Sequence, residues 1–206
     1  MKLHTFDLLK IKIEAREESL IRFFQEKTGL SSIPPEKQFW SLCNKQSRRP
    51  RSEINQLITA GIIKKEQYYG VDRDIRNIRK NKSNHPTAHW YHGEWNAVLR
   101  KNKGMFNPAI VFLDSTSMAE TESIVRSTYE TMLICPPSTF LFVNVMLNNP
   151  RDPTKQFTGN SFIKKLADIT HEIVWKKWIY DGKCFEYNAT GYTKMATYPF
   201  IRKSVI

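Results

Sequence analysis

Three strand-like segments in the first half of the chain each run into an acidic residue. They are residues 67–71 before Asp72, residues 88–93 before Glu94, and residues 109–113 before Asp114. Helical patterns separate them, and strands that alternate with helices indicate a parallel sheet with right-handed crossovers. The carboxyl ends of parallel strands lie on the same edge of a sheet, and open α/β sheets bind their ligands just outside that edge. The pattern therefore predicts a polar ligand site at the carboxyl edge.

The rest of the chain extends this alternation. A helix is expected from about Thr5 to Lys27, stopped by Thr28-Gly29, and a helix capped by Ser52 is expected to end at Gly61. Further helices are expected at 73–83, 95–101, 118–132 and 162–169, and further strands at 39–43 and 139–147. The run 139–147 is almost continuously apolar, which is typical of a strand covered on both faces.

The C-terminal segment has a different pattern. Residues 172–180, 184–187 and 193–203 are rich in aromatic and β-branched side chains, and Asp181-Gly182 and residues 188–191 separate them as turns. Short strands joined by such turns pair antiparallel. The sequence therefore predicts an α/β fold with a mostly parallel sheet, an antiparallel end and an added N-terminal helix.

Charge is the strongest compositional signal. The 206 residues include 32 basic and 20 acidic side chains, a formal net charge of +12. Such an excess favours a polyanionic partner, nucleic acid first and an anionic membrane surface second, although a generally basic protein without such a partner is the plainer alternative. The cysteines Cys43, Cys135 and Cys184 have no metal-ligand or disulfide spacing, and no secretory or membrane-spanning segment is apparent, so a reducing, cytoplasmic location without membrane insertion is expected.

This order of elements resembles the Rossmann-like fold of class I S-adenosylmethionine-dependent methyltransferases. The resemblance implies a seven-stranded sheet flanked by helices, whose last strand enters antiparallel after a hairpin. It covers residues 37–203 as the core and leaves residues 1–33 as a helical extension, all within one domain, 1–206. The cofactor implied is S-adenosylmethionine.

The resemblance also assigns cofactor-binding residues. The acid that ends the second strand binds the ribose hydroxyls, which here is Asp72 with Arg73 beside it, and a carboxylate can accept both hydrogen bonds of a diol. Gly93-Glu94-Trp95 follow the third strand and would lie near the adenine, with Trp95 able to stack on the base. Cys43 and Asn44 begin the loop that corresponds to the family's glycine-rich loop.

Two further assignments concern the acceptor. Asp114 and Ser115 follow the fourth strand, where the family places catalytic or substrate-facing groups, and Asp114 would orient or deprotonate the acceptor. The loop at 43–51 departs from the family, because it has no glycine and carries Lys45, Arg48, Arg49 and Arg51. These four side chains are candidates to bind the phosphates of a nucleic acid. The proline-rich motif that relatives acting on adenine or cytosine carry after the fourth strand is missing.

Structural roles compete with these assignments. Asp72 and Asp114 suit helix caps, and Glu94 suits the favourable charge at a helix start. His85, His89 and His92 lie close in sequence, but His89 and His92 would face opposite sides of a strand, so no metal site is predicted.

The function indicated is methyl transfer from S-adenosylmethionine, with a nucleic acid as the acceptor. The alternative is a catalytically degenerate member of the fold that binds nucleic acid or protein, which the missing glycines support. A nucleotide-dependent oxidoreductase is a third reading, and the same missing glycines disfavour it. The sequence leaves the oligomeric state open.

Overall fold

A computed structural model describes residues 5–42, 52–118, 121–149, 152–190 and 193–204 of the chain. The strands are β1 (Gln38–Leu42), β2 (Tyr68–Asp72), β3 (His89–His92), β4 (Pro108–Met118), β5 (Phe140–Met146), β6 (Asn148–Asn149), β7 (Asp152–Gln156), β8 (Trp178–Ile179), β9 (Phe185–Thr190) and β10 (Thr193–Arg202). All except β6 and β7 form one eight-stranded sheet in the order β3-β2-β1-β4-β5-β10-β8, with β9 also paired to β10. The strands β6 and β7 form a separate hairpin.

The first five strands in the sheet order, from β3 to β5, are parallel to one another, and the sixth, β10, runs in the opposite direction. The pairs β2–β3, β1–β2, β1–β4 and β4–β5 are all parallel. Strand β10 is antiparallel to β5 and lies beside it from Met195 to Ile201. On its other side β10 pairs with β9 and then with β8, so two short strands share the seventh position. This confirms the predicted fold class, and explains why the sheet has eight strands where seven were expected.

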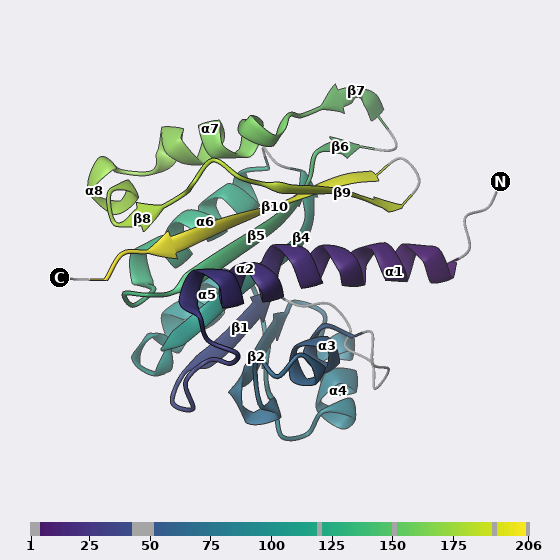
Figure 1. The fold of residues 1–206 in the computed structure, drawn as a ribbon, viewed down its shortest axis with the longest axis vertical. Helices are drawn as coiled ribbons and strands as arrows, with labels where there is room; N and C mark the ends of the chain where they lie inside the picture. The colour runs from purple at the N-terminus through teal and green to yellow at the C-terminus, as the bar shows by residue number, and fades with distance from the viewer. Residues whose placement is uncertain (1–4, 43–51, 119–120, 150–151, 191–192, 205–206) are drawn as a thin grey trace.

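Helices cover both faces of the sheet (Figure 1). They are α1 (Thr5–Arg16), a π-helical segment η1 (Glu17–Arg22), α2 (Phe23–Thr28), α3 (Glu53–Thr59), the 3₁₀ turn η2 (Lys65–Gln67), α4 (Ile75–Asn84), α5 (Trp95–Lys101), the 3₁₀ turn η3 (Lys103–Met105), α6 (Glu122–Ile134), α7 (Gly159–Ile169) and α8 (Glu172–Trp175). Within the described residues, no helix combines the length and the apolar character needed to cross a bilayer.

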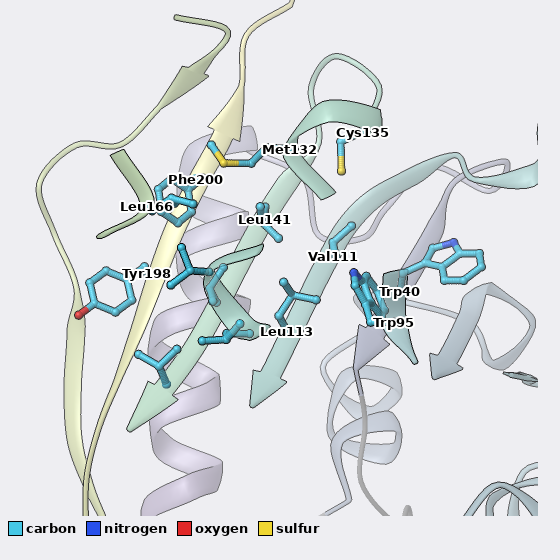
Figure 2. Packing of buried hydrophobic residues seen from close by; sticks show 14 of the residues in the cluster. Trp40, Trp95, Val111, Leu113, Met132, Cys135, Leu141, Leu166, Tyr198 and Phe200 are labelled. Carbon is cyan, nitrogen blue, oxygen red and sulfur yellow. The ribbon is translucent and has the colours of Figure 1, made fainter. Parts of the chain in front are cut away.

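Alternation along β4 divides the interior into two cores. Val111 and Leu113 belong to a cluster with side chains of α5, α6 and α7, and Figure 2 shows part of it. Ile110 and Phe112 belong to a second cluster, formed with η1, α2 and α3. The buried run of β5 serves both, as the sequence pattern of a doubly covered strand predicted.

The N-terminal helical segment is part of the second core. The rings of Phe23 and Phe24 meet Phe142 and Phe140 edge-on, with centroids 5.9 and 5.2 Å apart. Gly29 ends the segment with a left-handed φ of 68°, and its N–H donates to the Gln25 carbonyl. The helix and its stop at Gly29 were both predicted; the π-helical segment inside it was not.

Three local predictions were wrong. Residues 172–180 were expected to form a strand, but His171 accepts a hydrogen bond from the Ile173 N–H and starts the short helix α8, which leaves only β8 extended. Residues 148–153 were expected to be a loop, but part of them pairs in the β6–β7 hairpin. Helix α6 begins at Glu122 rather than Met118, because β4 continues to Met118.

Candidate functional site

The strand register places the predicted acidic residues on one edge of the sheet. Leu42 of β1 is level with Val71 on one side and Leu113 on the other, so Asp72 and Asp114 are each one residue further along. Two strand spacings of about 4.8 Å separate them, which is roughly 10 Å. Glu94 follows two residues after His92, the partner of Asp72 on β3. The predicted convergence at the carboxyl edge is therefore present.

Asp72 and Asp114 also share a face. Val71 and Leu113 point into the first core, whereas Tyr68 and Phe112 point into the second. Because side chains alternate along a strand, both carboxylates lie on the second face, beneath the N-terminal helices. Asp72 ends β2, as predicted. Asp114 does not end β4 but lies inside it, and the pairing of β4 with β5 is irregular between Asp114 and Met118.

Asp72 is held in place by the start of the next helix. Its Oδ1 accepts from the Asp74 N–H at 2.8 Å and its Oδ2 accepts from Asn77 Nδ2 at 2.9 Å. The helix cap proper is Asp74, which accepts from the Arg76 N–H. A carboxylate has about four acceptor sites, so Asp72 keeps roughly two for a ligand while its orientation is fixed.

The turn after β3 requires a glycine. Gly93 has a φ of 145°, and a Cβ there would lie 3.2 Å from Val98 Cγ2. Its N–H donates to the Asp72 carbonyl at 3.1 Å, which ties the ends of β2 and β3 together. Glu94 then starts α5 as an exposed N-cap residue without a capping hydrogen bond. Gly93 and Glu94 therefore sit beside Asp72, as the prediction for the adenine end requires.

Trp95 has a different environment from the one expected. It is 2% exposed, meets Trp40 edge-on at 6.5 Å, and donates from Nε1 to Thr131 Oγ1 at 2.8 Å. Such a ring is a core group that joins α5 to α6, and it has no free face to stack on a base. Arg73 is exposed at the tip of β2.

Asp114 belongs to a hydrogen-bonded group that spans four strands, β4, β5, β9 and β10. Asn144 of β5, 2% exposed, donates from Nδ2 to Asp114 Oδ1 at 2.7 Å and to the Tyr187 hydroxyl at 2.9 Å. The Thr197 hydroxyl donates to Asn144 Oδ1 at 3.2 Å. Burial, and then the charge of Asp114, raise the pKa of the Tyr187 hydroxyl, so it stays protonated. The arrangement fixes the half-buried Asp114 as a hydrogen-bond acceptor. Ser115, the other predicted catalytic residue, is 7% exposed within β4.

A second buried acid lies nearby and was not identified from the sequence. Glu53, 3% exposed at the start of α3, accepts from the Tyr68 hydroxyl at 2.8 Å and lies 4.0 Å from Arg16 of α1. Arg16 also donates to Gln56 Oε1 at 2.8 Å. Burial raises the pKa of the Glu53 carboxyl, whereas the Arg16 charge lowers it. In the sequence Glu53 looks like an ordinary acidic residue in the first turn of a helix. Its burial becomes apparent only from its contact with Arg16, which is far away in the sequence.

Helix α1 covers the polar side chains around Asp114. Lys12 and Arg16 line a cavity together with Asp114, Asn144 and Tyr187. Its free volume is about 10 Å³, close to the lower limit for one water molecule. A cavity of this size cannot hold a cofactor or an acceptor group.

A larger groove opens on the opposite face, between α5 and α6. It measures about 610 Å³ and begins at Glu94, with Arg100, Arg126 and Glu130 along its walls. Glu130 lies 3.1 Å from Arg126 and 4.0 Å from Arg100, so one carboxylate pairs with both guanidinium groups.

The remaining predicted residues, Cys43, Asn44, Lys45, Arg48, Arg49 and Arg51, lie outside the described residues. Among the residues that the structure does describe, no cluster of His, Cys, Asp and Glu could hold a metal ion.

Several solved structures with the same arrangement are methyltransferases. A TehB-like SAM-dependent methyltransferase from Corynebacterium glutamicum matches with a TM-score of 0.55 and 10% identity, over 96% of each chain. The fold is that of the class I methyltransferases. The plantazolicin methyltransferase BpumL, in complex with SAH, matches 96% of this chain and 85% of its own, with a TM-score of 0.57 and 7% identity.

The Methanococcus jannaschii fibrillarin pre-rRNA processing protein matches 84% of this chain and 70% of its own, with a TM-score of 0.53 and 10% identity. No protein-family model and no curated protein sequence matches this chain. At these identities the likeness establishes the class I methyltransferase fold, and the activity has to be argued from the site.

Proposed function

We propose that this protein is an S-adenosylmethionine-dependent methyltransferase whose acceptor is a nucleic acid. The observation that carries the proposal is the carboxyl edge itself. The class I strand order brings an oriented carboxylate at the tip of β2, Asp72, to within roughly 10 Å of a second one on β4, Asp114. Methyl transfer requires a cofactor site and an acceptor site side by side, and Asp72 and Asp114 would serve one site each.

The residues present suit this cofactor. Asp72 keeps unused acceptor sites for the two ribose hydroxyls, and Gly93 and Glu94 adjoin it at the end expected to meet the adenine. Cys43 and Asn44 would complete the site from the loop after β1. When bound, S-adenosylmethionine would supply an activated methyl group on sulfur.

The work of the chain's own residues would be mainly positional. Asp114, fixed by Asn144, would accept a hydrogen bond from the acceptor's amine or hydroxyl and take up its proton as the nucleophile attacks. Tyr187 and Thr197 hold Asn144, and so set the direction of the Asp114 carboxylate.

Two observations support a nucleic-acid acceptor. The net charge of +12 favours a polyanion, and a structural neighbour at 10% identity is a pre-rRNA processing protein. Lys45, Arg48, Arg49 and Arg51 would add phosphate contacts.

Calorimetric titration with S-adenosylmethionine and S-adenosylhomocysteine tests the cofactor. Asp72→Asn should weaken binding roughly 10- to 150-fold, because a hydrogen bond to a charged group contributes about 1.5–3 kcal/mol. Asn77 can present its amide oxygen to the new side chain, so the turn should survive. Asp168→Asn on the exposed surface of α7 is the matched control and should bind as the unaltered protein does.

Transfer of labelled methyl groups to total RNA and to DNA tests the activity. Asp114→Asn should lower the rate without changing cofactor affinity. If neither cofactor form binds while oligonucleotides bind in a salt-sensitive manner, the protein is the degenerate binding module and the enzyme proposal fails.

A further inference from the structure

A row of stacked rings runs across the first face of the sheet to its open edge. Trp40 of β1, Tyr69 of β2 and His89 of β3 are level with one another in the strand register. The Trp40 and Tyr69 rings are stacked at 4.9 Å and 22°, and the Tyr69 and His89 rings at 4.2 Å and 18°. Tyr91 lies on the same face of β3 and stacks with Trp40 at 5.4 Å.

The row passes from the core to solvent. Trp40 is fully buried, Tyr69 and Tyr91 are half-buried, and His89 is exposed. Among the described strands, β3 is the last on this side of the sheet, and none pairs beyond His89. The outermost ring of the stack is thus accessible to another flat ring from solution.

Helix α5 leaves a positive charge beside this row. Its buried side chains, Trp95, Val98 and Leu99, face the core, and Arg100 turns toward Glu130 of α6. Lys101 is exposed and lies 100° further round the helix than Arg100, on the flank away from α6. Helix α5 packs against β2, so this flank lies on the side of the sheet where β2 and β3 are.

The other face of the same edge is also positive. Helix α4 packs against β3 and β2, and Asn77 reaches Asp72 on the second face. Its Arg79, Lys80 and Lys82 are exposed, and the described residues supply no ion pair to them. The acid that follows β3, Glu94, lies at the strand's carboxyl end, whereas His89 begins the strand.

We propose that the β3 edge binds single-stranded nucleic acid. A base stacks on His89 and extends the ring row, while Lys101 and the basic side chains of α4 neutralise phosphates on either side. Flat rings flanked by cations suit an unpaired base and its backbone, whereas a lipid surface would need an apolar patch. Tyr69, the β2 partner of His89, lies three residues, about 10 Å, before Asp72 along β2, and its side chain is on the opposite face of the sheet. A strand held at this edge would therefore reach the carboxyl edge by passing around β3.

The proposal concerns the substrate of the proposed methyltransferase, but its test does not require methyl transfer. Fluorescence anisotropy measures the affinity of the full chain for labelled single-stranded and duplex oligonucleotides of equal length, without cofactor. His89→Ala removes the exposed ring and should weaken single-strand binding at least fivefold, and His89→Trp should strengthen it. His92→Ala, on the same strand and the opposite face, is the control and should stay within twofold of the unaltered protein.

Lys101→Ala should weaken binding of all sequences alike and reduce the slope of log K against log salt by about one, whereas Lys165→Ala on α7 should not. Equal affinity for duplex and single strand, equal losses in the two histidine variants, or no binding of any oligonucleotide would each overturn the proposal. Calorimetry of His89→Ala with S-adenosylmethionine tests the cofactor site independently of nucleic-acid binding at the β3 edge. Cofactor affinity should equal that of the unaltered protein, so either hypothesis can fail without the other.

Discussion

Replacing Arg16 by Met should destabilise the protein in a pH-dependent way. Arg16 lies 4.0 Å from the buried Glu53 carboxylate, the one ion pair that Glu53 makes with a described residue, and its side chain is only 11% exposed. Methionine keeps the apolar stem of the side chain but removes the charge and the hydrogen bond to Gln56. Glu53 is then left in the interior with the Tyr68 hydroxyl and without its cation.

The expected cost is about 3 kcal/mol in the free energy of unfolding at pH 8, the lower end of the range for a broken buried pair. Burial already raises the pKa of Glu53 above its usual 4.5, and loss of the Arg16 charge raises it further. A raised carboxyl pKa means that the folded state binds the proton more tightly than the unfolded state does. Stability therefore falls as pH rises from 4.5 to the folded pKa.

In the Arg16→Met variant the pH range over which stability falls extends to higher pH. The loss of unfolding free energy caused by the substitution should therefore be smaller at low pH. As pH falls through the raised pKa of Glu53, the carboxyl takes up a proton, and the cost should drop toward about 1 kcal/mol, that of the lost hydrogen bond to Gln56. Adding Glu53→Gln to the variant should likewise recover most of the loss at pH 8, because the amide can still accept from Tyr68.

Urea unfolding at pH 5, 6.5 and 8, with the two single variants and the double variant, measures these terms. Arg22→Met is the matched control: Arg22 pairs with Glu18 at 3.0 Å on the exposed surface, and its loss should cost less than 1 kcal/mol at any pH. A cost for Arg16→Met that is the same at pH 5 and pH 8, and that Glu53→Gln does not relieve, would refute the reasoning.

Three further predictions concern single positions. Trp95→Phe removes the hydrogen bond to Thr131 and should cost about 1–3 kcal/mol by urea unfolding, while S-adenosylmethionine affinity stays unchanged; a large loss of affinity would return Trp95 to the cofactor site. Tyr198→Phe should be neutral or stabilising by up to about 1 kcal/mol in thermal unfolding, because the buried Tyr198 hydroxyl finds no hydrogen-bond partner in the described parts of the chain. Gly29→Ala should cost about 1–2 kcal/mol from its left-handed φ alone, since no atom lies within 4 Å of the added methyl; a cost near zero would show that the C-cap relaxes.

The sequence predicted the parallel half of the sheet because its strands carry strong local signals. Residues 109–113 and 140–146 are apolar on both faces, and the acids at 72 and 94 follow strand ends where the chain turns to a helix. The strand pairing in the structure confirms that these ends share an edge.

What the sequence missed depends on contacts between distant residues. Arg16 and Gln56 are 40 positions apart, and nothing local to Glu53 shows that a helix will cover it. Trp95 has the sequence context of a site residue, but its indole is satisfied by Thr131, 36 positions away. The continuation of β4 beyond Asp114 likewise requires pairing with β5, which the neighbouring serine and threonine residues do not announce.

The inverted strand β10 has a consequence for biosynthesis. It supplies the only pairing seen along the outer edge of β5 in the described structure, over seven register pairs from Met195 to Ile201. Until the ribosome has released those late residues, the edge of a strand reading Phe-Leu-Phe-Val-Asn-Val-Met stays open, although its other neighbour β4 is already made. Nascent chains stalled before residue 195 should therefore be the species that chaperones retain and that self-associates.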